Sequence, residues 1–400
     1  MNNSPPEFSD NLASSILPGR GSANDPEKTI IQTPRISAQE LHKYVWGLIG
    51  VFGLMVISYP ISMNRVAQKE KFAPYKSHLK SLTLEYQPIE SLAATPILAF
   101  TNQTPERVVN APKHTLMRFM KSTYSVAYSP DGEIIAASTA AGGIKFWDTK
   151  DRSIIREFPA HQDSIYGIAF SPNSKTFATA SDDGTVKLWG AKLGELRVTL
   201  KEHAKTVYGV AFSPDSKTIA TASFDKTIRI WDVPTGNLKQ TLQGHENFVY
   251  AVAFTPDGRN VISASEDKSI KVWNVQMGEL VRSISGHTAP VMSIAVSPDG
   301  QTLASAGETI KLWNLSTGAV KNTLQGHTGA VYSVRFSADG KTIASSGIDR
   351  SIKLWDVDTG KLTRSLEHHT SAVPSVDFDL QSSGLASGSL DGTVKLWNAQ

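Results

Sequence analysis

The sequence predicts an all-β protein in which seven small antiparallel sheets, each of four strands, are arranged around one axis. Seven of the eight tryptophans fall in one series with successive spacings of 42, 42, 42, 40, 42 and 42 residues. A histidine lies 28 residues before the tryptophan in five of these repeats and 26 residues before it in a sixth. The complete repeats also hold four short runs of β-branched and aromatic residues. The seven tryptophans are Trp147, Trp189, Trp231, Trp273, Trp313, Trp355 and Trp397.

The repeat around Trp231 shows the pattern of one sheet. Its third run, TIRIW, alternates strictly between polar and apolar residues, and turns rich in Ser, Pro, Asp or Gly separate the four runs. A sheet this small cannot bury both faces alone, whereas seven stacked around an axis bury them and leave only short edges. The four strands are expected at residues 206–212, 218–223, 227–231 and 238–242.

The pattern also predicts how the ring closes. The last repeat ends three residues after Trp397 and therefore lacks a fourth strand of its own. Residues 113–119 precede the first repeat, and Leu116 occupies the position that an aliphatic residue holds in the fourth strand of other repeats. We expect this segment to complete the last sheet.

Two dipeptides recur at fixed places in the repeats. Gly-His pairs end at His245, His287 and His327, and Trp-Asp pairs begin at Trp147, Trp231 and Trp355. With these pairs the array resembles the WD-repeat β-propeller family over about 290 of the 400 residues. The resemblance implies a seven-bladed WD-repeat β-propeller of four-stranded antiparallel blades over residues 113–400, and it speaks for the fold more than for the function.

Five repeats hold a complete set of His, Ser or Thr, Asp and Trp. Such residues invite comparison with a nucleophilic triad, but a constellation present once per repeat is not expected to be an active site. The resemblance implies that each tetrad is a buried hydrogen-bond network within its blade. We therefore predict no catalytic, cofactor-binding or metal-binding residues. The tetrads are His161, Thr179, Asp183, Trp189; His203, Thr221, Asp225, Trp231; His245, Ser263, Asp267, Trp273; His327, Ser345, Asp349, Trp355; and His369, Ser387, Asp391, Trp397.

Two repeats depart from the tetrad pattern. The first has Phe119, Ala137 and Ala141 where His, Ser or Thr, and Asp belong. The fifth keeps its histidine and serine but has a shortened turn, Gly307-Glu308, without the aspartate. We expect both blades to be locally softer than the others.

The candidate partner-binding residues occupy positions that the fold does not dictate. Five residues after the histidine position stand five tyrosines, a methionine and Pro374, at the start of the innermost strand. In similar propellers this strand begins at the mouth of the central channel, where tyrosine gives a large and rigid contact area. The alternative is that these tyrosines only pack and reflect recent duplication. The proposed contact residues are Tyr124, Tyr166, Tyr208, Tyr250, Met292, Tyr332, Phe224, Phe248, Ile348 and Leu390.

Two repeats have a charged residue at a position where the other five repeats have alanine. Arg335 and Asp377 both lie eight residues after their histidines, in neighbouring repeats. We predict a structural ion pair between two blades.

The first part of the chain predicts a membrane anchor. Residues 44–64 carry no charge over 21 residues, and a helix of about 31 Å matches a hydrocarbon core of about 30 Å. A buried core helix and a cleaved signal peptide are the alternatives, but the 43 preceding residues are too many for a signal peptide. We expect a single transmembrane helix there, a disordered tail at residues 1–43 and a linker at residues 65–112.

The basic residues on either side of this segment weakly favour an orientation with the propeller on the cytoplasmic side. The 15 residues before it hold Arg35 and Lys43, and the 15 after it hold four basic residues. The opposite orientation stays open.

Overall charge argues against nucleic acid as a partner. The chain has 40 basic and 37 acidic residues, and residues 113–400 have 30 and 28, which leaves no strongly positive field. We therefore predict a membrane-anchored scaffold that binds a protein or peptide. A regulatory or assembly subunit of a membrane complex is the first alternative. An enzyme or small-ligand binder using the central channel is less favoured because no unrepeated cluster of acid, base and metal ligands is present.

Overall fold

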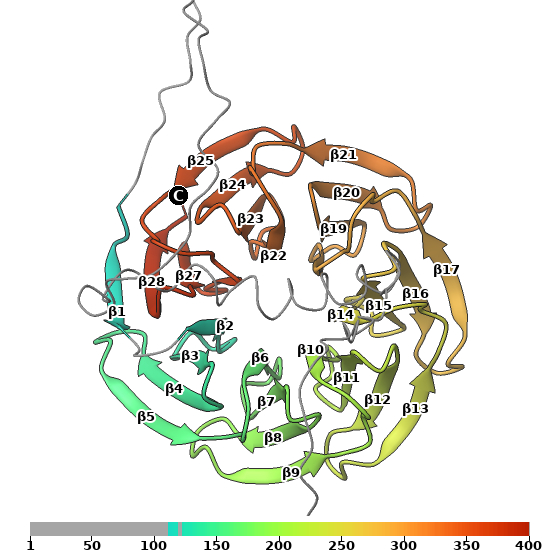
Figure 1. The fold of residues 1–400 in the computed structure, drawn as a ribbon, viewed down its shortest axis with the longest axis horizontal. Helices are drawn as coiled ribbons and strands as arrows, with labels where there is room; N and C mark the ends of the chain where they lie inside the picture. The colour runs from blue at the N-terminus through green and yellow to red at the C-terminus, as the bar shows by residue number, and fades with distance from the viewer. Residues whose placement is uncertain (1–110, 119–121, 400) are drawn as a thin grey trace, which may run out of the picture. The chain divides into compact units, whose positions relative to one another are not determined.

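The computed structural model describes residues 111–118 and 122–399. They form seven antiparallel sheets of four strands, placed like blades around one axis (Figure 1). The first strand of each blade lies at the axis and the fourth at the rim. The predicted all-β, seven-bladed architecture is confirmed.

In blades 1 to 6, four consecutive strands pair in chain order: β2–β5, β6–β9, β10–β13, β14–β17, β18–β21 and β22–β25. Blade 7 consists of β26, β27, β28 and β1, so its fourth strand comes from the start of the array. The innermost strands are β2 (Thr123–Tyr128), β6 (Ile165–Phe170), β10 (Val207–Phe212), β14 (Val249–Phe254), β18 (Ser293–Val296), β22 (Val331–Phe336) and β26 (Ser375–Phe378). The second strands are β3 (Ile134–Thr139), β7 (Thr176–Ser181), β11 (Thr218–Ser223), β15 (Asn260–Ser265), β19 (Thr302–Ala306), β23 (Thr342–Gly347) and β27 (Gly384–Gly388). The third strands are β4 (Gly143–Asp148), β8 (Val186–Gly190), β12 (Ile228–Asp232), β16 (Ile270–Asn274), β20 (Ile310–Asn314), β24 (Ile352–Asp356) and β28 (Thr393–Asn398). The outer strands are β5 (Ile154–Pro159), β9 (Leu196–Leu200), β13 (Leu238–Leu242), β17 (Leu280–Ile284), β21 (Val320–Leu324), β25 (Leu362–Leu366) and β1 (His114–Arg118).

The hydrophobic core lies between neighbouring blades. Ile228 and Ile230 on β12 pack in one buried cluster with Val249, Val261 and Trp273 of the next blade. Alternation along a strand sends successive side chains to opposite faces, so each blade contributes to the core on both sides. A single blade would expose these apolar side chains, so each blade depends on its neighbours for a core.

The ring closes between the two ends of the array. β1 pairs with β28, with His114 opposite Leu396 and Leu116 opposite Val394, so the outer strand of blade 7 comes from the segment before the first repeat. Leu116 is buried in a cluster that joins blade 7 to blade 1. The strand pairing and the apolar contact together link residues nearly 280 positions apart.

Each blade has two ends that differ in their loops. One end holds the turn between the second and third strands and the connection into the next blade; Phe224 N donates to Thr206 O there. We call this end the tyrosine face, because the tyrosine register described above begins there. The opposite end holds the other two turns, where Val233 N donates to Lys217 O.

Among residues 111–118 and 122–399, no helix is both long enough and apolar enough to cross a bilayer. The predicted tail at 1–43, the predicted membrane helix at 44–64 and nearly all of the predicted linker at 65–112 lie outside the described residues.

Candidate functional site

All five predicted tetrads are assembled. In blade 3, His203 Nδ1 lies 2.8 Å from Asp225 Oδ2, and His203 Nε2 lies 2.7 Å from Thr221 Oγ1. Trp231 Nε1 donates to the same threonine oxygen over 2.9 Å. The other four sets repeat these contacts within 0.1 Å of these distances.

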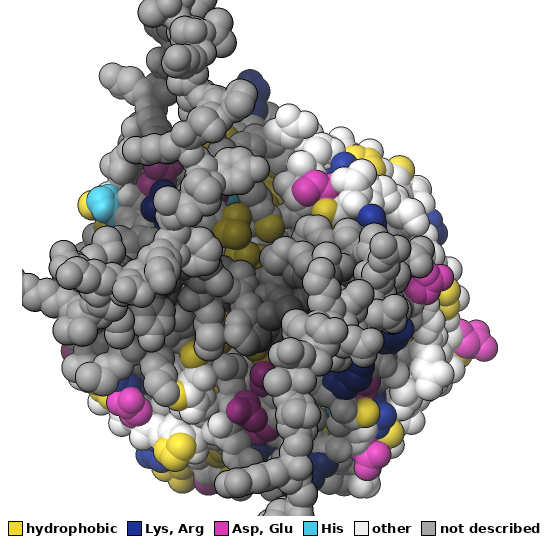
Figure 2. All heavy atoms as spheres, in the orientation of Figure 1, with side chains coloured by type: hydrophobic (Ala, Val, Ile, Leu, Met, Phe, Trp, Pro, Cys, Tyr) yellow, Lys and Arg dark blue, Asp and Glu magenta, His cyan; other side chains and the backbone are white. Residues whose placement is uncertain are grey.

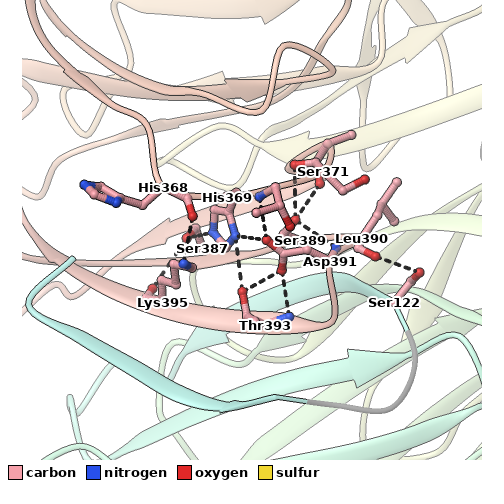
Figure 3. Close-up of polar contacts among 12 residues, drawn as sticks. Ser122, His368, His369, Ser371, Ser387, Ser389, Leu390, Asp391, Thr393 and Lys395 are labelled. Atoms are coloured by element: carbon pink, nitrogen blue, oxygen red, sulfur yellow. Dashed lines mark hydrogen bonds and ion pairs between the residues drawn. The ribbon is translucent and has the colours of Figure 1, made fainter. Parts of the chain in front are cut away.

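Figure 3 shows His369, Ser387 and Asp391 of the blade 7 tetrad. Asp391 accepts hydrogen bonds from Thr370 N and from the Thr393 hydroxyl in addition to its contact with His369. Burial opposes ionisation of Asp391, but the hydrogen bonds from His369 and Thr393 outweigh it, so the pKa of this carboxyl lies below its ordinary value. The network therefore joins the connection from blade 6 into blade 7 to the turn between β27 and β28.

The tetrad hydroxyls cannot act as nucleophiles. Ser387 is fully buried, and its oxygen already accepts from Trp397 Nε1 while contacting His369 Nε2. The hydroxyl residues of the other four tetrads are fully buried as well. Because these oxygens are buried, the geometry favours a network that stabilises the blade over a nucleophile open to substrate.

The two exceptional blades replace the missing aspartate differently. In blade 5, Glu308 accepts from the N–H groups of Thr288 and Ala289. Its Oε2 is 3.6 Å from His287 Nδ1, and this nitrogen has no hydrogen-bond partner among the described residues. In blade 1, Thr139 Oγ1 accepts from Gly143 N, and Ala141 is exposed at the turn. Phe119 lies outside the described residues, and greater softness of both blades stays a prediction.

The tyrosine register forms a ring at the channel mouth. Tyr124, Tyr166, Tyr208, Tyr250 and Tyr332 are second in their innermost strands, whereas Met292 and Pro374 immediately precede theirs. All seven side chains line a cavity of about 100 Å³. The rings of Tyr124 and Tyr166 are 5.1 Å apart, and those of Tyr166 and Tyr208 stack at 4.9 Å. The structure therefore brings together the residues of this register from all seven blades.

The hydroxyls of the five ring tyrosines have no hydrogen-bond role in the described part of the fold. Within residues 111–118 and 122–399, none of the five ring hydroxyls makes a hydrogen bond to the protein. Burial raises the pKa of each of these five phenols, so they stay neutral and able to donate. A role limited to packing would not require five hydroxyls without protein partners.

Two further predicted residues extend the ring on blades 3 and 4. Phe224 stacks on Phe248 at 4.5 Å between ring centres, and it meets the edge of Tyr250 at 5.6 Å. We call Tyr208, Phe224, Phe248 and Tyr250 the aromatic cluster.

The remaining predicted contact residues lie apart from this cavity. Ile348, which is 49% exposed, and the half-buried Leu390 occupy the corresponding turns of blades 6 and 7. Neither belongs to the residues that line the cavity in the described part of the chain. The structure thus joins eight of the ten predicted contact residues and leaves these two on the surrounding surface.

The predicted ion pair between blades is present. Arg335 Nε on β22 lies 3.5 Å from Asp377 Oδ1 on β26. Asp377 Oδ2 also accepts from Tyr128 N over 2.8 Å, which links blade 7 to blade 1. Burial raises the pKa of Asp377 to about 6, and Arg335 opposes this shift. The second link, to Tyr128, could not be read from the repeat pattern.

Charged residues of both signs lie on the face of the propeller that Figure 2 shows. Figure 2 shows Lys or Arg and Asp or Glu side chains interspersed around the visible rim of the molecule. Among the described residues, no group of three or more His, Asp or Glu side chains is placed to hold a metal ion.

A closed ring of seven four-stranded blades, five of which hold a complete His-Ser/Thr-Asp-Trp network, defines a β-propeller built from repeats. The family model of the WD domain, G-beta repeat, matches residues 113–148, 318–356 and 360–398. The model described as WDR90, 4th beta-propeller, matches residues 164–302. No curated protein matches the chain. Over these residues the propeller is similar to WD-repeat β-propellers, which supports the resemblance that the sequence pattern indicates.

WD-repeat propellers generally serve as scaffolds for protein interactions and are typically not enzymes. This general role agrees with the predicted class of function.

Proposed function

We propose that this chain is a membrane-anchored scaffold whose tyrosine face binds a protein or peptide partner. Residues 44–64 would hold it in the bilayer, with the propeller on the cytoplasmic side. The observation that carries the proposal is the ring of five tyrosines whose hydroxyls have no partner within the described residues.

The physical properties of the ring suit a polypeptide. Tyrosine offers an amphipathic surface that loses little conformational entropy on binding, and each free hydroxyl can bond to a main-chain amide or carbonyl. The cavity of about 100 Å³ is smaller than the 300–1,000 Å³ that is usual for a small-molecule site. A partner that spreads over the mouth and inserts one side chain fits this shape better than an enclosed ligand.

Crosslinking and mass spectrometry in the native membrane test the interaction. We expect crosslinked partners with the wild-type chain and their loss when Tyr166, Tyr208 and Tyr250 are all replaced by Ala. The matched triple Phe variant keeps the rings, and it should retain part of the recovery if hydroxyl bonds and ring contacts both contribute.

Two controls make this test decisive. Met277→Ala removes a side chain that is 68% exposed at the opposite end of blade 4, and it should leave recovery unchanged. The triple Ala variant should still unfold in one cooperative transition, at a Tm lowered by the lost ring contacts, so that lost recovery is not explained by loss of the fold. Undiminished recovery with the triple Ala variant would refute the proposal.

The membrane part is tested separately. A tag placed after Gln400 should be digested by external protease in inside-out vesicles and protected in right-side-out vesicles. The reverse pattern would place the propeller on the other side, and release of the chain by alkaline carbonate would refute the anchor.

A further inference from the structure

Neighbouring blades meet on the tyrosine face through a repeated pair of positions. The residue before the turn aspartate of one blade faces the residue three after the histidine of the next. Between blades 2 and 3, Asp182 Oδ1 accepts from the Thr206 hydroxyl over 2.5 Å. Between blades 3 and 4, Phe224 stacks on Phe248. In both pairs the two side chains contact each other directly, through a hydrogen bond in the first pair and through ring stacking in the second.

The same pair between blades 4 and 5 is mismatched. Glu266 holds the first position, and Pro290, which has no side-chain donor, holds the second. Val291 N donates to Ser265 O across this boundary over 3.0 Å, so Pro290 is fixed beside the turn that carries Glu266. The neighbouring blade therefore supplies no donor to this carboxylate from that position.

The half-buried side chain of Glu266 has no polar partner in the described part of the chain. Its main-chain N–H donates to Phe248 O, but its carboxylate makes no hydrogen bond or ion pair within residues 111–118 and 122–399. Burial raises the pKa of Glu266, and its charge in turn contributes to the raised pKa of Tyr250, whose ring lies at the cavity. A carboxylate partly removed from water without a donor is stabilised when a cation reaches it.

The aromatic cluster beside Glu266 already attracts a cation. Lys205 Nζ lies 5.9 Å from the centre of the Phe248 ring. Aromatic rings bind the planar guanidinium of arginine and pack against the methylene groups of arginine or lysine, while a carboxylate accepts from the charged end.

We infer that Glu266, Phe248 and Tyr250 form a subsite for an arginine or lysine side chain of the partner. This inference rests on the proposed function of the tyrosine face and adds the chemistry of one partner residue. The rings contact the stem of the side chain, and Glu266 accepts a charge-assisted hydrogen bond from its end.

A displayed library of random short peptides, selected on the full-length chain, tests the subsite. We expect Arg or Lys to be enriched at one position on the wild-type chain. Glu266→Gln should lower that enrichment about tenfold, as expected for one charge-assisted hydrogen bond. Glu246→Gln removes an exposed carboxylate from the same face of blade 4 and should leave the enrichment unchanged.

The same library separates the subsite from the proposed function. Selection without enrichment of a basic residue on the wild-type chain, or unchanged enrichment on Glu266→Gln, would overturn the subsite. If the Tyr166, Tyr208 and Tyr250 triple Ala variant loses the peptides while Glu266→Gln keeps the basic preference, only the subsite fails. If the triple variant keeps the peptides, the proposed function fails as well.

Discussion

Replacing Asp225 with Ala should destabilise the propeller by about 3 kcal/mol. Asp225 accepts four hydrogen bonds, from His203 Nδ1, Ala204 N, Thr227 N and the Thr227 hydroxyl. Its side chain is 9% exposed and that of His203 is 2% exposed, so the variant leaves a buried imidazole N–H without an acceptor. We assign about 2 kcal/mol to that buried contact and about 1 kcal/mol to the bonds within the turn.

Calorimetry of the full-length chain measures this effect. A loss of about 3 kcal/mol corresponds to a fall in Tm of about 6 °C for a domain of this size. Asp215→Ala is the matched control, because Asp215 also accepts two hydrogen bonds in a turn of blade 3 but is exposed and has no histidine partner. Equal falls in Tm for the two variants would refute the view that the tetrad is a buried stabilising network.

Two further predictions concern the seam between the ends of the array. Deletion of residues 113–119 removes the partner of β28, so we expect aggregation in light scattering, and a monodisperse variant with wild-type Tm would contradict this. Asp377→Asn keeps an acceptor for Tyr128 N and removes a charge that burial disfavours. The folded pKa of about 6 exceeds the unfolded value, so this carboxyl reduces stability as pH rises through the interval between them. We expect Asp377→Asn to raise Tm at neutral pH, with a smaller gain at about pH 5, and a gain that grows on acidification would reverse the reasoning.

The fold and its repeated contacts were predictable because each depends on residues at fixed spacing. The separation of His203, Thr221, Asp225 and Trp231 recurs in four other repeats, and one physical solution serves all of them. The tyrosine register was predictable for the same reason, since equivalent residues of a closed ring must meet around its axis.

Side-chain contacts between two different repeats could not be predicted from residue spacing. Whether Glu266 has a partner is decided by Pro290 in the next blade, and the contrast with Asp182 and Thr206 appears only when the blades are side by side. The substitute role of Glu308 depends on how a shortened turn points its longer side chain at main-chain N–H groups. Spacing alone contains neither side-chain direction nor the identity of the facing residue.

The strand that closes the ring also determines at which end of the propeller the preceding chain enters. His114 begins β1 opposite Leu396, and Lys113 and His114 share a small hollow with Asp379 and Ser382, at the end away from the tyrosine face. The described chain therefore enters β1 at the end of blade 7 that lies opposite the tyrosine face. A pull on the chain before residue 113 would load the β1–β28 hydrogen bonds, because this pairing joins β1 to blade 7.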